Sequence, residues 1–342
     1  MTSGQQIRPM HPLFLLSVWR SGSSLLHALL NQHSQIALLY EGELPQLQSL
    51  LWAHLRDGSW HERWEFYNQG PSRHGLKVEL PPEVRDVWQA TRIVYQEFCR
   101  RKQAVIWGEK SPHWFDNALE IARRFPDARF IFLWRNLNEV LQSIRRAALS
   151  ERFFRKPGYI TRVLLGTEKL RHTCDALRAQ GRSVHELDYQ ELISHPVESM
   201  QQICSFLELP FEPQMASLVG ADRSATFPGE HHSLVRADRI FPVKKETEVL
   251  PLAVRQKVAR YVCRWQQAQS TRWPLLPSNE LDGVHPPSRF ESLRDRIIFR
   301  ALLTRDLGVK LIYGAVPLSF ARLLRSCLRQ RVHAKKFLEV SQ

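Results

Sequence analysis

The stretch PLFLLSVWRSGSSLL, residues 12–26, contains two successive patterns that decide how the fold begins. Residues 12–18 are almost entirely apolar, which predicts a short strand buried on both faces, as in a parallel sheet. Leucines then recur at helical spacing, at positions 25, 26, 29 and 30, which predicts a helix. The chain therefore starts with a strand, a tight turn and a helix, preceded by a loose N-terminus at residues 1–11.

The same alternation continues along the chain. Apolar runs predict four further strands, at residues 36–40, 104–107, 129–134 and 183–187. Helical spacing predicts helices within residues 45–101 and at residues 114–124, 136–148 and 199–207. Such alternation specifies an α/β fold, a P-loop-like three-layer sandwich with a central parallel sheet and with ligands at the carboxyl ends of its strands. We expect one domain over residues 12–280.

Composition narrows the class of protein and of partner. The net charge of +14 implies an anionic partner, but it does not choose among a nucleotide, a nucleic acid and an acidic membrane. Five widely spaced cysteines without a CxxC pair favour neither a disulfide framework nor a zinc site, and they fit a reducing compartment. No apolar run is long enough to span a membrane, so we expect a cytoplasmic protein that can be peripheral at the membrane.

The turn between the first strand and the first helix has the composition of a phosphate-binding loop. Gly22 allows a tight turn, and the backbone amides of residues 21–25 are expected to point toward an anion on the helix axis. Arg20 adds a positive charge, and Ser23 and Ser24 add hydroxyl donors. Ser/Gly turns at such places are also common without a ligand, so the loop alone leaves an ordinary turn as an alternative.

This loop is not a Walker A motif, because the lysine of GxxxxGK[ST] is missing. The strand at 129–134 ends in Arg135 rather than in an aspartate suited to Mg²⁺. A sulfuryl group carries less negative charge than a phosphoryl group, so protein donors and cations can stabilise its transfer without a metal. The residues therefore fit a metal-free group transferase.

Three segments carry a resemblance to a known family. Residues 19–26, WRSGSSLL, resemble the PRSG[ST][ST]LL loop of sulfotransferases, especially the bacterial and tyrosylprotein branches, with tryptophan in place of the usual proline. Residues 125–143, FPDARFIFLWRNLNEVLQS, are similar to a second signature of the family, and residues 184–209 resemble a third. The likeness extends over roughly residues 12–268 and includes, most loosely, a basic loop at residues 229–245.

The resemblance implies that the cosubstrate is 3′-phosphoadenosine-5′-phosphosulfate (PAPS). It assigns the 3′-phosphate to Arg135 and Ser143, and the 5′-phosphosulfate to Arg20, Ser21, Gly22, Ser23, Ser24 and Leu25. An arginine that leaves a strand and a serine in the second turn of the next helix can converge on one oxygen-rich group. The alternative is that Arg135 caps the helix and Ser143 faces solvent.

Sulfuryl transfer requires a base for the acceptor hydroxyl. Glu41 and Glu43 follow the second strand, whose end should lie beside the phosphate loop, and the resemblance places Glu41 at the position of the family's base. Glu43 stays a close alternative, and His113 ranks behind both.

The leaving nucleotide needs a cation near its bridging oxygen. Lys110, in the segment GEKSP, resembles the lysine of the family's EKxP motif, which contacts the sulfuryl bridge. Its alternative role is an ion pair of little energetic weight with Glu109 or Asp116.

The predicted function is sulfuryl transfer from PAPS to a hydroxyl of a sugar, glycolipid, phenol or other small metabolite, with adenosine-3′,5′-bisphosphate as product and no metal. The aromatic stretch at residues 60–67 either stacks on a flat acceptor or belongs to the core. The alternatives are a small-molecule kinase and a catalytically silent anion- or nucleic-acid-binding protein on the same fold, although no nucleic acid is expected as a partner.

The C-terminal extension, residues 285–342, carries much of the charge. Residues 289–342 contain twelve Lys/Arg against four Asp/Glu, a net +8, interleaved with apolar residues at helical spacing. Basic helices of this kind either dock across the enzyme, which we favour, or lie on an anionic membrane, which a lipid-linked acceptor would favour.

Overall fold

The computed structural model describes most of the chain. The described residues are 11–51, 59–68, 75–112, 117–155, 158–222, 250–268 and 275–323, together with 224, 235, 240, 325 and 326.

A parallel sheet with the strand order β2-β3-β1-β4-β5 forms the centre of the molecule. Its strands are β1 (His11–Leu16), β2 (Ile36–Tyr40), β3 (Ile106–Ser111), β4 (Arg129–Trp134) and β5 (Val184–Asp188). All five predicted strands are confirmed. The third extends farther than predicted, so that Lys110 lies inside β3 rather than after it.

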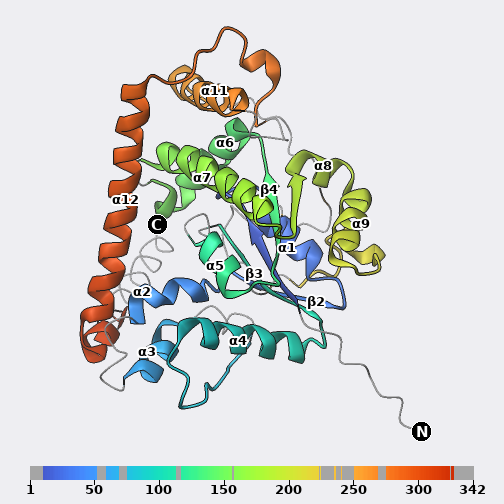
Figure 1. Ribbon diagram of the computed structural model, residues 1–342, viewed down its shortest axis with the longest axis vertical. Helices are drawn as coiled ribbons and strands as arrows, with labels where there is room; N and C mark the ends of the chain where they lie inside the picture. The colour runs from blue at the N-terminus through green and yellow to red at the C-terminus, as the bar shows by residue number, and fades with distance from the viewer. Residues whose placement is uncertain are drawn as a thin grey trace, which may run out of the picture.

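Helices cover both faces of this sheet, which confirms the predicted three layers (Figure 1). Along β1, Phe14 and Leu16 join the buried cluster on one face, whereas Leu13 and Leu15 join the cluster on the other. Because β1 is buried on both faces, its sequence is apolar throughout instead of alternating with polar residues.

The helices on one face of the sheet are α1 (Ser23–Leu30), α8 (Tyr189–Ser194) and α9 (Pro196–Leu207). The cluster on the other face draws on α2 (Gln48–Leu51), α3 (Trp60–Tyr67), α4 (Val87–Arg101), α5 (Ala118–Arg124), α6 (Leu137–Ser150), α7 (Tyr159–Ala179), α11 (Leu252–Gln267) and α12 (Arg289–Ala315). Short 3₁₀ turns occupy Leu44–Leu47, Arg152–Arg155, Pro213–Ala216 and Ser278–Glu280. Of the predicted helix at 114–124, residues 114–116 lie outside the described part of the chain.

The long helix α7 has no counterpart among the predicted elements. It packs between the sheet and α12, and residues on nearly all its sides are buried, including polar ones such as Arg162, Thr167 and Arg171. Polar residues that become buried through tertiary contacts blur the apolar stripe by which a helix is recognised in sequence.

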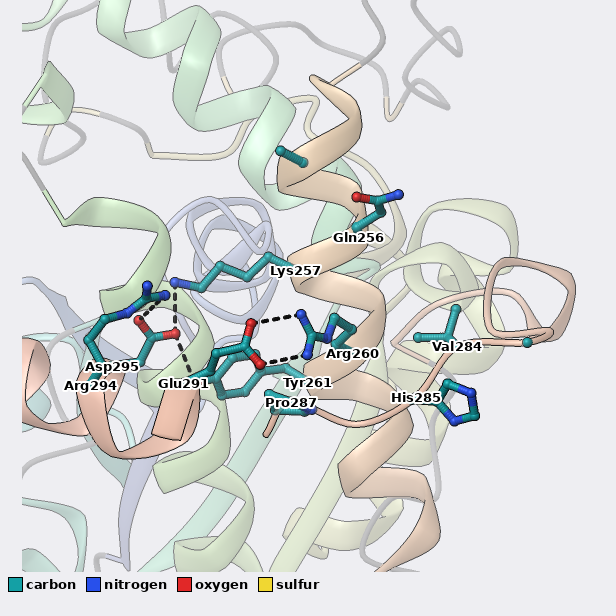
Figure 2. Close-up of a pocket in the computed structure, with 12 residues that line it drawn as sticks. Gln256, Lys257, Arg260, Tyr261, Val284, His285, Pro287, Glu291, Arg294 and Asp295 are labelled. Carbon is teal, nitrogen blue, oxygen red and sulfur yellow. Dashed lines mark hydrogen bonds and ion pairs between the residues drawn. The ribbon is translucent and has the colours of Figure 1, made fainter. Parts of the chain in front are cut away.

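The first turns of α12 are fixed to α11 by ion pairs (Figure 2). The guanidinium of Arg260 donates two hydrogen bonds to Glu291, at 2.8 and 2.6 Å. The buried carboxylate of Asp295 accepts from the Tyr261 hydroxyl at 2.9 Å and lies 2.8 Å from Lys257 Nζ. A cavity of about 590 Å³ lies beside these pairs, and none of the predicted active-site residues lines it.

From there α12 runs along one side of the molecule to α2 (Figure 1). Phe299 is buried in the domain core, Asp306 pairs with Arg162 of α7, and Gly314 lies against the backbone of Leu50. Residues 289–315 thus form a helix docked on the domain. The boundary between a domain at 12–280 and an extension at 285–342 stays a prediction.

We predict that Gly314→Ala weakens this docking. A Cβ at Gly314 would lie 2.7 Å from the Leu50 carbonyl oxygen, so α12 must shift away from α2. The free energy of unfolding, measured by urea denaturation, should fall by about 1–3 kcal/mol.

Gly308→Ala, in the same helix, is the matched control. No heavy atom lies within 4 Å of a Cβ at Gly308. Alanine should therefore stabilise the helix by up to about 1 kcal/mol. A Gly314→Ala protein as stable as the Gly308→Ala protein would contradict the contact.

Candidate active site

The turn between β1 and α1 requires glycine at position 22. Gly22 has φ +97°, and a Cβ there would lie 2.3 Å from the ring of Tyr189. Its carbonyl accepts the amide of Leu25 at 2.9 Å, so this amide is already engaged in the first turn of α1. The contact of Leu25 with an anion stays a prediction.

Two hydroxyls of this loop are buried without a hydrogen-bond partner among the described residues, those of Ser17 and Ser21. An unsatisfied buried hydroxyl costs free energy, so such groups in a loop usually await a ligand or water. Trp19, which stands where the family has proline, is buried and packs on Tyr159 with 5.6 Å between ring centroids. Packing of the Trp19 ring therefore anchors the loop in place of the proline.

The two predicted halves of the nucleotide site meet in space. Arg20 Nε donates to Ser143 Oγ at 3.1 Å, and Arg135 Nη1 donates to the Arg20 carbonyl at 3.1 Å. Burial and the positive charge of Arg135 both lower the pKa of Arg20. Two guanidinium groups held together at low exposure form a strong site for an anion.

The alternative roles considered for Arg135, as a helix cap, and for Ser143, as a solvent-facing residue, do not match the arrangement around α6. Asn136, not Arg135, caps α6, because its side chain accepts the amides of Asn138 and Glu139. Ser143 is only 8 % exposed, so it does not face solvent.

A second cluster of charges lies at the ends of β2 and β3. Lys110 is 2 % exposed, pairs with Glu41 and lies 3.4 Å from the hydroxyl of Ser24 in the phosphate loop. Tyr40 closes the cluster, with its hydroxyl 2.8 Å from Ser24 Oγ and its ring 4.4 Å from Lys110 Nζ. Burial alone would lower the pKa of Lys110, but Glu41 and Tyr40 more than offset it, so the pKa lies above its usual value.

Among the described residues Lys110 pairs with Glu41 and not with Glu109, one of the two acids considered for it in sequence. Glu109 points to the other face of β3, and Asp116 lies outside the described residues. Of the candidate bases, Glu43 is 3.5 Å from Ser111 Oγ, whereas His113 also lies outside the described part of the chain.

Glu109 is a buried residue that sequence reasoning missed. Its carboxylate accepts the amide of Glu43 at 2.5 Å and the hydroxyl of Tyr95, and it packs under Gly42. Both Glu41 and Glu43 have positive φ, at 46° and 53°, so Glu109 holds a strained turn that carries both candidate bases. The only signal in sequence is its place beside Lys110 in GEKSP.

The two tryptophans of the aromatic stretch at 60–67 belong to the core. Trp60 and Trp64 are each 1 % exposed and stack on each other with 5.6 Å between ring centroids. These two rings are therefore not available to stack on an acceptor. Of the basic loop at 229–245, only Val235 and Ile240 are described.

These features define an α/β protein of P-loop-like fold with clustered cations and phosphate-loop hydroxyls at the carboxyl ends of β1, β3 and β4. A model of the sulfotransferase family matches residues 12–213, more than half of the chain. The chain therefore belongs to the sulfotransferase family, and it is a PAPS-dependent sulfotransferase, as the sequence predicts.

Two solved sulfotransferase domains are similar to this chain at low sequence identity. The sulfotransferase domain from the curacin biosynthetic pathway has a TM-score of 0.50 and 19% identity, covering 77% of this chain and 98% of that one. The sulfotransferase domain of the Synechococcus PCC 7002 olefin synthase has a TM-score of 0.49 and 18% identity, covering 80% and 99%. No curated protein sequence matches the chain.

Two features are absent from the described residues. None of their helices combines the length and the apolar character needed to cross a bilayer. Nor do they contain a group of three or more His, Cys, Asp or Glu placed to hold a metal ion. The expectation that no metal takes part stays a prediction.

Burial of Glu109 predicts a characteristic dependence of stability on pH. Burial raises its pKa from 4.5 to about 8, although hydrogen bonds from Tyr95 and the Glu43 amide lower it in part. The unfolded carboxyl loses its proton at lower pH than the folded one, so stability should fall as the pH rises from 4.5 to about 8. The free energy of unfolding, measured by denaturation at several pH values, should fall less over this range in Glu109→Gln than in the unmodified protein. The difference should be on the order of 4 kcal/mol.

Glu62→Gln is the control for this comparison, because the Glu62 side chain is 67% exposed. Its pH profile should follow that of the unmodified protein. If the pH profile of Glu109→Gln also matched that of the unmodified protein, the Glu109 carboxyl would ionise in the folded protein as easily as in the unfolded chain. That result would contradict the effect expected from its burial.

Proposed function

We propose that this enzyme transfers the sulfuryl group of PAPS to an acceptor hydroxyl by in-line displacement. The observation that carries the proposal is the contact of Arg20 with both Ser143 and Arg135, which joins the two phosphate motifs in one site. In this scheme Arg135 and Ser143 bind the 3′-phosphate. The 5′-phosphosulfate lies on Arg20, Ser21, Gly22, Ser23, Ser24 and Leu25.

The residues of the loop fit such a ligand. The buried hydroxyls of Ser17 and Ser21 lack partners in the described structure and can donate to anionic oxygens. Gly22 lies at the N-terminus of α1, and anions bind favourably at that end of a helix. Arg20 and Arg135 supply the charge that the cosubstrate needs.

The second cluster supplies the groups for the chemical step. Glu41 takes the proton of the acceptor hydroxyl, the hydroxyl oxygen forms a bond to sulfur, and the bond from sulfur to the bridging phosphate oxygen breaks. Lys110 stabilises the negative charge that the leaving oxygen gains. The contacts of Lys110 with Glu41 and with Ser24 of the phosphate loop support this division of roles.

Glu43 and His113 stay alternatives for the base, and the acceptor stays open among sugars, glycolipids, phenols and other small metabolites. Membership of the sulfotransferase family favours neither a kinase nor a catalytically silent binding protein. A lipid-linked acceptor, a cytoplasmic location and membrane contact by the extension stay predictions.

The nucleotide site is tested by binding of adenosine-3′,5′-bisphosphate. Arg135→Ala and Arg20→Ala should each weaken binding, measured by calorimetry, by about 10- to 100-fold, the loss expected for a charge-assisted hydrogen bond. Ser143→Ala should weaken it less.

Arg129→Ala is the matched control, because Arg129 lies at the opposite end of the same strand and pairs with Glu208 at 2.6 Å. Its affinity for the nucleotide should be unchanged. Unchanged affinity in Arg135→Ala would remove the central assignment.

The catalytic roles are tested by turnover with radiolabelled PAPS and a panel of sugars, glycolipids, phenols and tyrosyl peptides. Glu41→Gln should lower kcat by roughly 100-fold or more, as expected for loss of a general base, with nucleotide affinity nearly unchanged. Lys110→Ala should also lower kcat. If Glu43→Gln loses the activity and Glu41→Gln keeps it, the base is Glu43.

A further inference from the structure

The outward face of α12 is uncharged along its whole length. Starting at Phe290, residues at steps of three or four share one face of a helix, directly opposite the docked face. Seven of the eight are exposed and one, Gly308, is half-buried; they are Phe290, Leu293, Ile297, Ala301, Thr304, Gly308, Ile312 and Ala315. Phe290 is 74 % exposed, Ile297 59 % and Ile312 65 %. We call these eight residues the outer stripe.

Charges on α12 are divided between its two sides. Its five arginines are all exposed: Arg294 and Arg305 lie on one flank of the outer stripe and pair with Asp295 and Asp306, whereas Arg289, Arg296 and Arg300 lie on the other flank. Its three acids are all turned toward the domain: Glu291 pairs with Arg260, Asp295 with Lys257, and Asp306 with Arg162. The outer stripe itself therefore carries no acid, and Arg289, Arg296 and Arg300 add positive charge along one side of it.

We propose that the outer stripe lies on an anionic lipid membrane. A helix of 27 residues is about 40 Å long, and its position along one side of the molecule leaves its outer face clear of the domain (Figure 1). Helices that lie in the interface of a bilayer combine an apolar face with flanking arginines, which bind the phosphates of acidic headgroups. The sulfotransferase thus associates with the membrane surface through α12.

Charge complementarity favours a membrane over a second copy of the chain. In a symmetric dimer the same patch meets itself, so the arginines of the two helices would face each other with no acid on either stripe. Like charges placed opposite each other oppose association. An anionic lipid surface neutralises the same arginines.

The test measures binding of the full chain to phosphatidylcholine vesicles with and without phosphatidylglycerol, by flotation at low and high salt. Binding should require phosphatidylglycerol and weaken as salt rises. Arg296→Gln with Arg300→Gln should weaken it about 25-fold, roughly fivefold per arginine. Ile297→Ser with Ile312→Ser, two exposed positions, should weaken it at least about tenfold.

Control pairs change the same residue types elsewhere on the surface. Arg100→Gln with Arg123→Gln alters arginines of α4 and α5 whose side chains are 73% and 72% exposed. Leu149→Ser with Val219→Ser alters apolar residues that are 78% and 63% exposed. Both control pairs should bind vesicles like the unmodified chain.

Three results would overturn the proposal. The first is no binding to phosphatidylglycerol vesicles at low salt. The second is equal binding by the α12 pairs and the control pairs, which would place the affinity elsewhere, such as in the basic residues after 326. The third is self-association, seen by sedimentation, that Ile297→Ser with Ile312→Ser abolishes while vesicle binding is absent, since a second copy would then cover the stripe.

Discussion

The parallel pairing of β1 with β3 depends on Gly108, and the active-site geometry depends on that pairing. Gly108 has φ +146°, and a Cβ there would lie 2.0 Å from the carbonyl oxygen of Leu13, its register partner in β1. Only glycine permits this approach. The register that follows sets Lys110 opposite Leu15 and beside Tyr40 of β2, so the side chain reaches Ser24 at the start of α1. On the other side of β1, β4 ends beside the same loop and brings Arg135 to Arg20.

This arrangement gathers charges that the fold alone does not need. Arg20 and Arg135 repel each other at low exposure, and the lowered pKa of Arg20 reflects both its burial and that repulsion. Lys110 and Glu41 form a pair in which the lysine is almost fully buried, and replacing such a pair by apolar residues is often neutral for stability. Conflicts of this kind concentrate at functional sites, because binding a nucleotide with two anionic groups offsets the cost of holding the cations together.

Much of this could be predicted from sequence, and the failures have identifiable causes. The strands at 36–40 and 129–134 were predicted to the residue because continuous apolar runs bounded by polar residues leave little freedom. The convergence of Arg20, Arg135 and Ser143 follows from parallel topology, which puts successive strand ends at one edge. The sequence did not predict that Lys110 pairs with Glu41. Its neighbour Glu109 was considered instead, but side chains alternate along a strand, so Glu109 points to the opposite face. Glu109 itself finds its partner Tyr95 on α4, a contact that no local pattern encodes.

Docking of α12 and the composition of its outer face are separate constraints. The inward face is accounted for by Phe299 in the core, by the close approach of Gly314 to Leu50, and by acids matched to cations of α7 and α11. None of these contacts determines which residues occupy the opposite side of α12. A helix that only covers the domain would normally carry charges of both signs there, which favours solubility. Two isoleucines and a phenylalanine that are more than half exposed, on a stripe without an acid and with arginines on both flanks, are therefore a property of the sequence that folding does not explain. A surface that selects for both apolar contact and positive charge does explain it, and an acidic bilayer is such a surface.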